Sequence, residues 1–274
     1  MQSKIDEYKK INKNNMSKNI FTLFLFALLG FVSCSDRDSN SVPSSAQVFT
    51  TFKFTHNWDG TPVNTSNFNT LQYTNAYGDL LSIERLRYLI SDITFTTNNN
   101  EALIFKVYNL VDVTNANNLS FTPQILIPKG SYNVSFTFGF DNEDNAENYL
   151  DLNSESFNVP TNLGGGYHYM QFDGKFMNAN DAEQGFNYHA IRAVDNPGMN
   201  PTFPQDTFIT VNLGIITITD DPEIEVQMNI AQWFKDPNLW DLNVLNQMLM
   251  PNSSAQIQMF ENGQNVFSLG EVTQ

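Results

Sequence analysis

Alternation of apolar and polar side chains along most of the chain is the feature that most constrains its fold. From residue 223 to 230 every second residue is apolar, and residues 132–140 repeat the pattern with phenylalanines at alternate positions. A two-residue period places successive side chains on opposite faces of a strand. Strands are expected at residues 50–58, 88–96, 103–110, 122–127, 132–140, 166–176, 186–193, 207–217 and 223–230.

Strands with one apolar and one polar face are typical of antiparallel sheets that cover a core on one side and meet water on the other. Turn-forming pairs such as Asp173-Gly174 and Asp221-Pro222 separate several of the expected strands. We therefore predict a mainly β protein, an antiparallel β-sandwich, in a single domain over residues 47–274.

Two segments fit strands less well. Residues 231–250 contain Trp233 and Trp240 but are interrupted by Pro237, so we expect two short C-terminal helices packed against one end of the sandwich. Residues 82–89 are compatible either with an initial helical turn or with a strand that is not preceded by one.

The first 33 residues have the pattern of a secretion signal. Lys18 precedes an apolar run of 13 residues, Ile20–Val32, whereas a membrane-spanning helix needs about 20. The run ends at Ser33-Cys34, a small residue followed by the only cysteine, as in a bacterial lipobox. We predict a lipoprotein signal peptide over residues 1–33 and lipidation of Cys34. The alternative is a buried thiol in an ordinary helix.

Residues 34–46 form a polar tether behind the lipidated cysteine, and their acidic start resembles the surface-export tags of Bacteroidota lipoproteins. We expect an outer-membrane lipoprotein that faces the periplasm or the cell surface. The chain has a net charge of −15, and residues 1–33 contribute five lysines against two acids, which leaves −18 for the remainder. Such an acidic body argues against nucleic acid as a partner and leaves membrane attachment to the lipid anchor.

The three histidines are the first candidates for chemistry. His56, His168 and His189 each lie in or at the end of an expected strand, and Met170 shares the face of His168. Neutral imidazole with a thioether suits Cu(I), Cu(II) or Zn(II). The alternative is that each histidine is hydrogen-bonded separately and has a structural role.

An acidic loop is the second candidate. Asp141, Glu143 and Asn145 offer oxygen ligands at a density that suits Ca²⁺. The loop is not an EF-hand, because Ala146 stands where the turn glycine is required and Leu152 where the bidentate glutamate should be. A solvated acidic loop without an ion is the alternative.

Signals for catalysis are absent from the sequence. It contains neither a GxSxG motif nor a phosphate-binding glycine loop with lysine. No nucleophile–base pair can be argued from the residues, so we expect a binding protein and not an enzyme.

Several motifs in order resemble the MbnP-like family of periplasmic and lipid-anchored proteins. The stretch 233–241 resembles a Bacteroidota branch of that family. The matching segments are residues 52–56, 74–78, 86–91, 127–132, 136–140, 166–170 and 186–189.

The resemblance implies a β-sandwich that binds copper through histidines and a kynurenine, which a dihaem partner enzyme makes from tryptophan. His56 and His189 correspond to family histidines, whereas His168 has no firm counterpart. The family tryptophans lie just before a Gly-Tyr pair, where this chain has residues 161–166 without tryptophan. Trp58 is then the only candidate for a modified residue, and a simpler His/Met copper site is expected.

These observations predict a lipid-anchored copper-binding protein that carries or sequesters copper at the cell envelope. The alternative is a surface β-sandwich that acts as an interaction or ligand-binding module and whose histidines are purely structural. Convergence of residues 56, 168 and 189 at one site would favour the copper-binding hypothesis.

Overall fold

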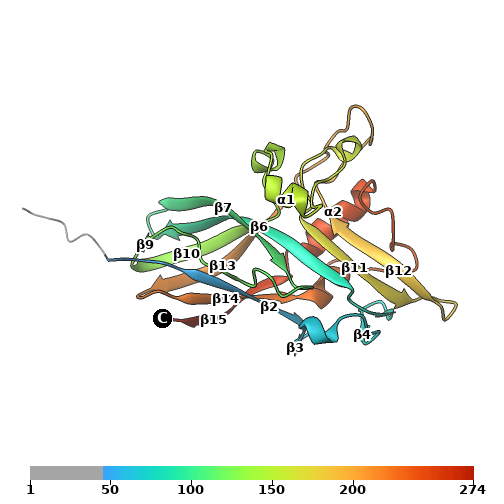
Figure 1. Ribbon diagram of the computed structural model, residues 1–274, viewed down its shortest axis with the longest axis horizontal. Coiled ribbons are helices and arrows are strands. Elements are labelled where there is room, and N and C mark those ends of the chain that lie inside the picture. The colour runs from blue at the N-terminus through green and yellow to red at the C-terminus, as the bar shows by residue number, and fades with distance from the viewer. Residues whose placement is uncertain (1–45) are drawn as a thin grey trace, which may run out of the picture. The chain divides into compact units, whose positions relative to one another are not determined.

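A computed structural model describes residues 46–274 of the chain. The predicted signal peptide, Cys34 and nearly all of the tether lie outside the described residues. The described part is built from two main sheets that face one another across a core (Figure 1). The fold is mainly β with few short helices, which confirms the predicted class.

The larger sheet contains eight strands. Its order is β13 (Ile209–Ile218), β10 (Gly130–Phe138), β6 (Arg85–Thr97), β11 (Met170–Met177), β5 (Leu80–Leu81) and β4 (Tyr73–Thr74), with β7 (Ala102–Asp112) on β6 and β12 (Glu183–Ala190) on β11. The long strand β6 pairs along one edge first with β11 and then with β10. The sheet therefore has two halves, joined through β6.

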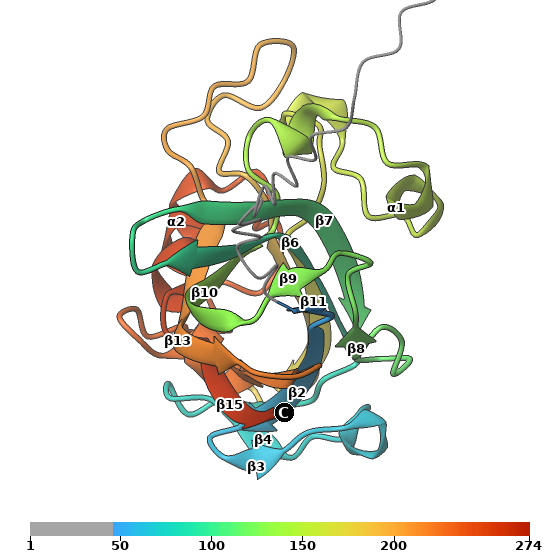
Figure 2. The same cartoon turned by 90° about the vertical axis from the view of Figure 1, so that its left-hand side faces the viewer.

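The smaller sheet contains five strands. Its order is β15 (Phe267–Thr273), β14 (Glu223–Asn229), β2 (Thr51–Trp58) and β3 (Thr61–Pro62), with β8 (Ser120–Phe121) also on β2. The pairing of β14 with β2 is parallel, unlike the antiparallel pairs around it. Both sheets curl, so that β2 and β15 face β6 and β10 in Figure 2, and β13 contacts β15. A separate two-stranded sheet joins β1 (Gln47–Val48) to β9 (Ile127–Pro128).

One expected strand, at residues 122–127, is wrong. The chain makes only the short strands β8 and β9 at the two sides of this segment. Pro123 supplies no backbone donor for a strand ladder, which explains the interruption. The open question at residues 82–89 is resolved in favour of a strand, because β6 begins at Arg85.

The expected pair of helices at residues 231–250 is also wrong. The segment contains one five-residue 3₁₀ helix, η4 (Ile230–Phe234), and then continues without a helix through Pro237. The long helix lies later, at α2 (Ser253–Gly263), where the side chain of Asn252 caps the N-terminus by accepting from the Ala255 N–H. The remaining short helices are η1 (Thr65–Asn67), η2 (Asp144–Ala146), α1 (Leu150–Ser154) and η3 (Thr161–Leu163).

Strand β11 separates the core from the opposite face of the large sheet. Its residues Met170 and Phe172 are fully buried among core side chains, while Gln171 and Asp173 point the other way. The core is rich in aromatic side chains, and Tyr88 of β6 lies at its centre against Phe54 and Phe138. A residue that pairs with Met170 or Phe172 therefore faces the core, and one that pairs with Gln171 or Asp173 faces the outer side of the sheet.

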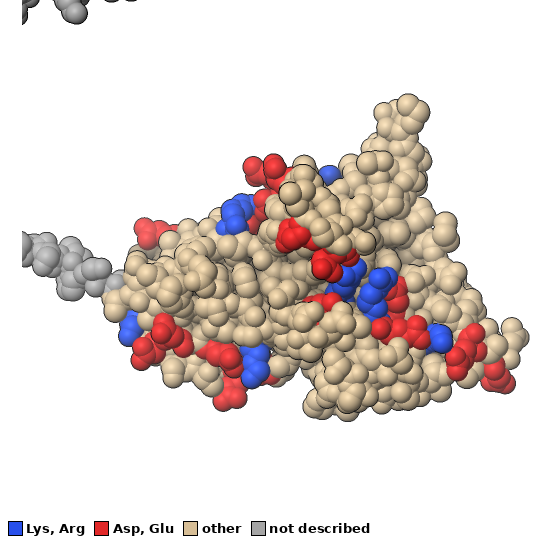
Figure 3. All heavy atoms as spheres, viewed as in Figure 1, with Lys and Arg blue, Asp and Glu red and all other residues tan. Residues whose placement is uncertain are grey.

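Every basic side chain in the described part of the chain has an acidic neighbour. Each of the eight Lys and Arg residues within residues 46–274 has a carboxylate oxygen within 4.0 Å. Figure 3 shows such blue side chains beside red ones on one face. Within residues 46–274, no helix has the length and apolar character needed to cross a membrane.

Candidate metal centre

The β11–β12 hairpin brings two of the three histidines together. His189 lies opposite Gln171 in the hairpin, and His168 lies two residues before the start of β11. The two imidazole rings have centroids 5.3 Å apart and are nearly perpendicular, at 83°. His168 and His189 therefore form a histidine pair on the outer side of the large sheet.

Hydrogen bonding defines the tautomer of His168. Its Nδ1 lies 2.9 Å from the carbonyl oxygen of Phe157, and because a carbonyl can only accept, Nδ1 must carry the proton. The other ring nitrogen, Nε2, is buried and has no hydrogen-bond partner among residues 46–274. Burial lowers the pKa of His168 to about 4. The ring is therefore neutral near pH 7, with a bare lone pair on Nε2.

His189 is oriented by a carboxylate. Its Nε2 lies 2.7 Å from Oδ1 of Asp173. The Asn187 side-chain amide also donates to this Oδ1, at 2.6 Å, and Arg85 donates through Nε to the other carboxylate oxygen, Oδ2. Burial alone would raise the pKa of Asp173, but the hydrogen bonds from His189, Asn187 and Arg85 outweigh it and lower this pKa to about 2. With Nε2–H donated to a carboxylate, Nδ1 of His189 is the nitrogen left for a ligand.

His56 and Met170 lie on the other side of the large sheet. The Nε2 of His56 is 3.0 Å from the Tyr88 hydroxyl inside the core, and Met170 lies opposite Tyr88 in the β6–β11 ladder. Both side chains are buried, and burial lowers the pKa of His56 to about 4. The structure thus separates the four predicted ligands into an outer pair, His168 and His189, and an inner pair, His56 and Met170.

Trp58, the predicted site of modification, follows His56 on the inner face of β2. Its indole stacks on Tyr73 with a centroid distance of 4.8 Å and donates to the carbonyl of Thr74 at 3.3 Å. It is buried. The structure places it with the inner residues and not beside the histidine pair.

The predicted calcium loop has a different arrangement from the one expected. Asp141 accepts from the backbone N–H groups of Glu143 and Asp144 at 2.9 and 2.8 Å, so one of its oxygens caps the loop. Asn145 turns inward and accepts from the N–H of Tyr167 at 2.8 Å. The three predicted residues therefore do not point to a common centre.

A different set of three carboxylates, which includes Asp141, does approach a common point. Oxygen atoms of Asp92, Asp141 and Asp144 lie within 4.8 Å of one another. The Lys106 ammonium lies 3.2, 3.4 and 3.2 Å from them, respectively. Burial raises the pKa of Asp92 despite this contact. The protein's own lysine thus already neutralises part of the cluster.

Asp173 is a site residue that the sequence did not reveal. The prediction of a turn at Asp173-Gly174 is wrong, because both residues lie inside β11 and pair with β12. In the structure, a turn in which the Asn178 N–H donates to the Ala182 carbonyl sets the hairpin register that pairs His189 with Gln171. Asp173 is two residues further along the same face. The Phe157 carbonyl, by contrast, belongs to the long loop before β11, and no pattern in the sequence indicates its contact with His168.

Taken together, these features define a class: a β-sandwich with a histidine pair, His168 and His189, at the outer side of one strand hairpin. The MbnP family model matches residues 46–252, and the chain belongs to the MbnP family. Among solved structures, MbnP from Methylosinus trichosporium is similar over 82% of this chain and 99% of that chain, with 11% identity and a TM-score of 0.50. At this identity the likeness concerns the fold alone. A comparison with curated proteins found no match.

Proposed function

We propose that this protein binds copper at the histidine pair and carries or sequesters the ion at the cell envelope, where a lipid on Cys34 anchors it. The observation that carries the proposal is the bare, buried Nε2 of His168 beside the His189 ring. Membership of the MbnP family supports copper as the cargo.

The donor set fits a copper ion. A buried nitrogen lone pair without a hydrogen bond is costly unless a ligand fills the site. Imidazole is a good ligand for copper, which also binds such sites more tightly than the other divalent first-row metals. The Phe157 carbonyl and Asp173 hold the second nitrogen of each ring, as outer partners of metal-binding histidines commonly do. Binding, and not catalysis, is the role that these residues support.

Alanine substitution of the histidine pair tests this proposal. Titrating purified H168A and H189A with Cu(I) against a competing chelator should show affinity lowered more than about 100-fold, because each variant removes a direct nitrogen ligand. H56Q is the matched control, since His56 lies on the opposite side of the sheet. Affinity equal to the parent in both H168A and H189A would contradict the site.

Mass spectrometry of the protein from its native host tests anchoring and modification. We expect an N-terminus at Cys34 that carries acyl groups, with residues 1–33 removed. Trp58 is the candidate for oxidation by a dihaem partner enzyme, but its stacking on Tyr73 away from the histidine pair favours an unmodified indole. A chain that retains residues 1–33, or a kynurenine at position 58, would contradict the respective expectation.

A further inference from the structure

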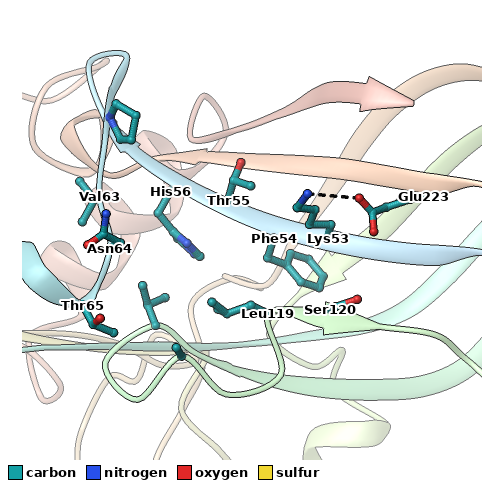
Figure 4. Close-up of a pocket in the computed structure, with 13 residues that line it drawn as sticks. Lys53, Phe54, Thr55, His56, Val63, Asn64, Thr65, Leu119, Ser120 and Glu223 are labelled. Carbon is teal, nitrogen blue, oxygen red and sulfur yellow. Dashed lines mark hydrogen bonds and ion pairs between the residues drawn. The ribbon is translucent and has the colours of Figure 1, made fainter. Parts of the chain in front are cut away.

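A cavity next to β2 is separate from the histidine pair. It has a volume of about 450 Å³ and opens between β3, β8 and the loop before β8. Figure 4 shows His56 and Phe54 on the β2 side of this cavity, with Leu119 and Thr65 on the other sides. Most of its lining is apolar, including Val63 and Val113.

The backbone of β2 is incompletely paired where it borders the cavity. The Phe54 N–H donates to the Leu119 carbonyl at 2.8 Å, and the His56 carbonyl accepts from the Val63 N–H at 2.8 Å. Between these bonds, the Phe54 carbonyl and the His56 N–H have no hydrogen-bond partner among residues 46–274. Both groups point to the same edge of β2, because alternate residues of a strand direct their backbone groups to the same side.

One residue in peptide linkage would satisfy both groups. In a parallel pair, a residue donates its N–H to the carbonyl of one strand residue and accepts from the N–H two residues later. A bound residue opposite Thr55 would make these two bonds, to Phe54 and His56. Backbone groups next to a cavity are normally paired with protein, water or ligand, so the gap in pairing matches the polar atoms of a peptide unit.

Charge further restricts the ligand. The two ionised residues at the rim, Lys53 and Glu223, are paired with each other at 3.2 Å. His56 is held through Nε2 by the Tyr88 hydroxyl, and burial keeps its pKa near 4, so the ring is neutral at pH 7. The cavity therefore presents no unpaired charge, and a neutral ligand suits it.

We propose that this cavity is a second binding site, which takes a neutral ligand containing one apolar residue in peptide linkage and holds it by a single parallel β-bridge to Phe54 and His56. Binding here is independent of copper. The site accommodates a small N-acylated amino-acid amide as the minimal ligand.

The test uses N-acetyl-L-leucinamide as the probe and amide ¹⁵N–¹H spectra of the purified protein as the readout. Binding should shift the His56 and Leu119 amide signals, whereas amides around His168 and His189 stay unchanged. T65W places a large ring at the cavity wall and should abolish the shifts. S66W changes the neighbouring exposed residue, which does not line the cavity, and should retain them.

An ester analogue of the probe tests the proposed bridge. Replacing the N–H of the bound residue by oxygen removes the donor to the Phe54 carbonyl and should weaken binding about tenfold. Equal affinity of amide and ester would overturn the bridge. Absence of shifts up to the solubility limit of the probe, or shifts that persist in T65W, would overturn the site.

Discussion

Single residues determine what the histidine pair can bind. His168 donates Nδ1–H to a backbone carbonyl, and His189 donates Nε2–H to Asp173, so the free nitrogens are different atoms of the two rings. Alternation along the strands predicted that His168 shares a face with Met170, which is wrong, because the two side chains lie on opposite sides of the large sheet. It also gave no indication of which histidines would be neighbours. That depends on pairing across the sheet and on the loop before β11, neither of which a two-residue period encodes.

Asp173 should act on copper through His189. We expect D173N to lower copper affinity about 10–100-fold, because the neutral amide no longer stabilises the orientation and proton position of the ring as a carboxylate does. Competitive titration with Cu(I) measures the change. D181N alters an exposed acid in the turn of the same hairpin and serves as the control. A D173N variant that binds like the parent would remove Asp173 from the site.

At the scale of elements, the β11–β12 hairpin packs very closely against the backbone next to β5 at one glycine, Gly174. A Cβ at Gly174 would overlap the backbone carbonyl oxygen of Ser82, next to β5, and the ring of Phe186. A Cβ at Gly185, on the paired strand, would meet no atom closer than 3.9 Å. The hairpin therefore packs tightly along β11 and loosely along the outer edge of β12.

The two glycines give a matched pair of variants. G174A should lower the free energy of unfolding by about 2–3 kcal/mol, because the backbone of Ser82 cannot move away without breaking strand contacts. G185A should change it by less than about 1 kcal/mol. Urea denaturation of both variants measures the difference. Equal stabilities would show that β5 can move away from β11.

The strands were predictable where side chains alternate, as in β2, β10 and β14, because burial of one face imposes the pattern. The helix α2 was not, since its start is signalled by Asn252 and not by the aromatic residues upstream. Trp233 lies in the 3₁₀ helix η4 and Trp240 in irregular backbone, and both are buried in the core. Aromatic residues therefore indicated burial there, but not secondary structure. The parallel pairing of β2 with β14 joins distant segments and has no local signal.

For the molecule as a whole, two buried neutral histidines couple folding to pH. His56 and His168 have folded-state pKa values of about 4, below the ordinary value of 6.5. Between these values the unfolded chain binds more protons than the folded one, so stability is lost as pH falls. Asp173, with a pKa of about 2, adds to the loss only below its ordinary value of 3.8.

We expect the copper-free protein to lose about 2 kcal/mol of stability per histidine between pH 7 and pH 5. Urea unfolding midpoints at the two pH values measure the loss. H56Q removes one titrating group and should show about half of the pH dependence. Equal midpoints of the parent protein at pH 7 and pH 5 would contradict the burial of neutral rings.

The hairpin also has a consequence for inheritance. His168, Asp173 and His189 are encoded within one short stretch of the gene, residues 168–189, and the contacts between them arise from a single turn. A duplicated or recombined fragment that includes this stretch would transmit the two rings and their carboxylate together. Substitutions accumulating elsewhere in the sandwich leave them linked, so the histidine pair can persist while the rest of the protein diverges.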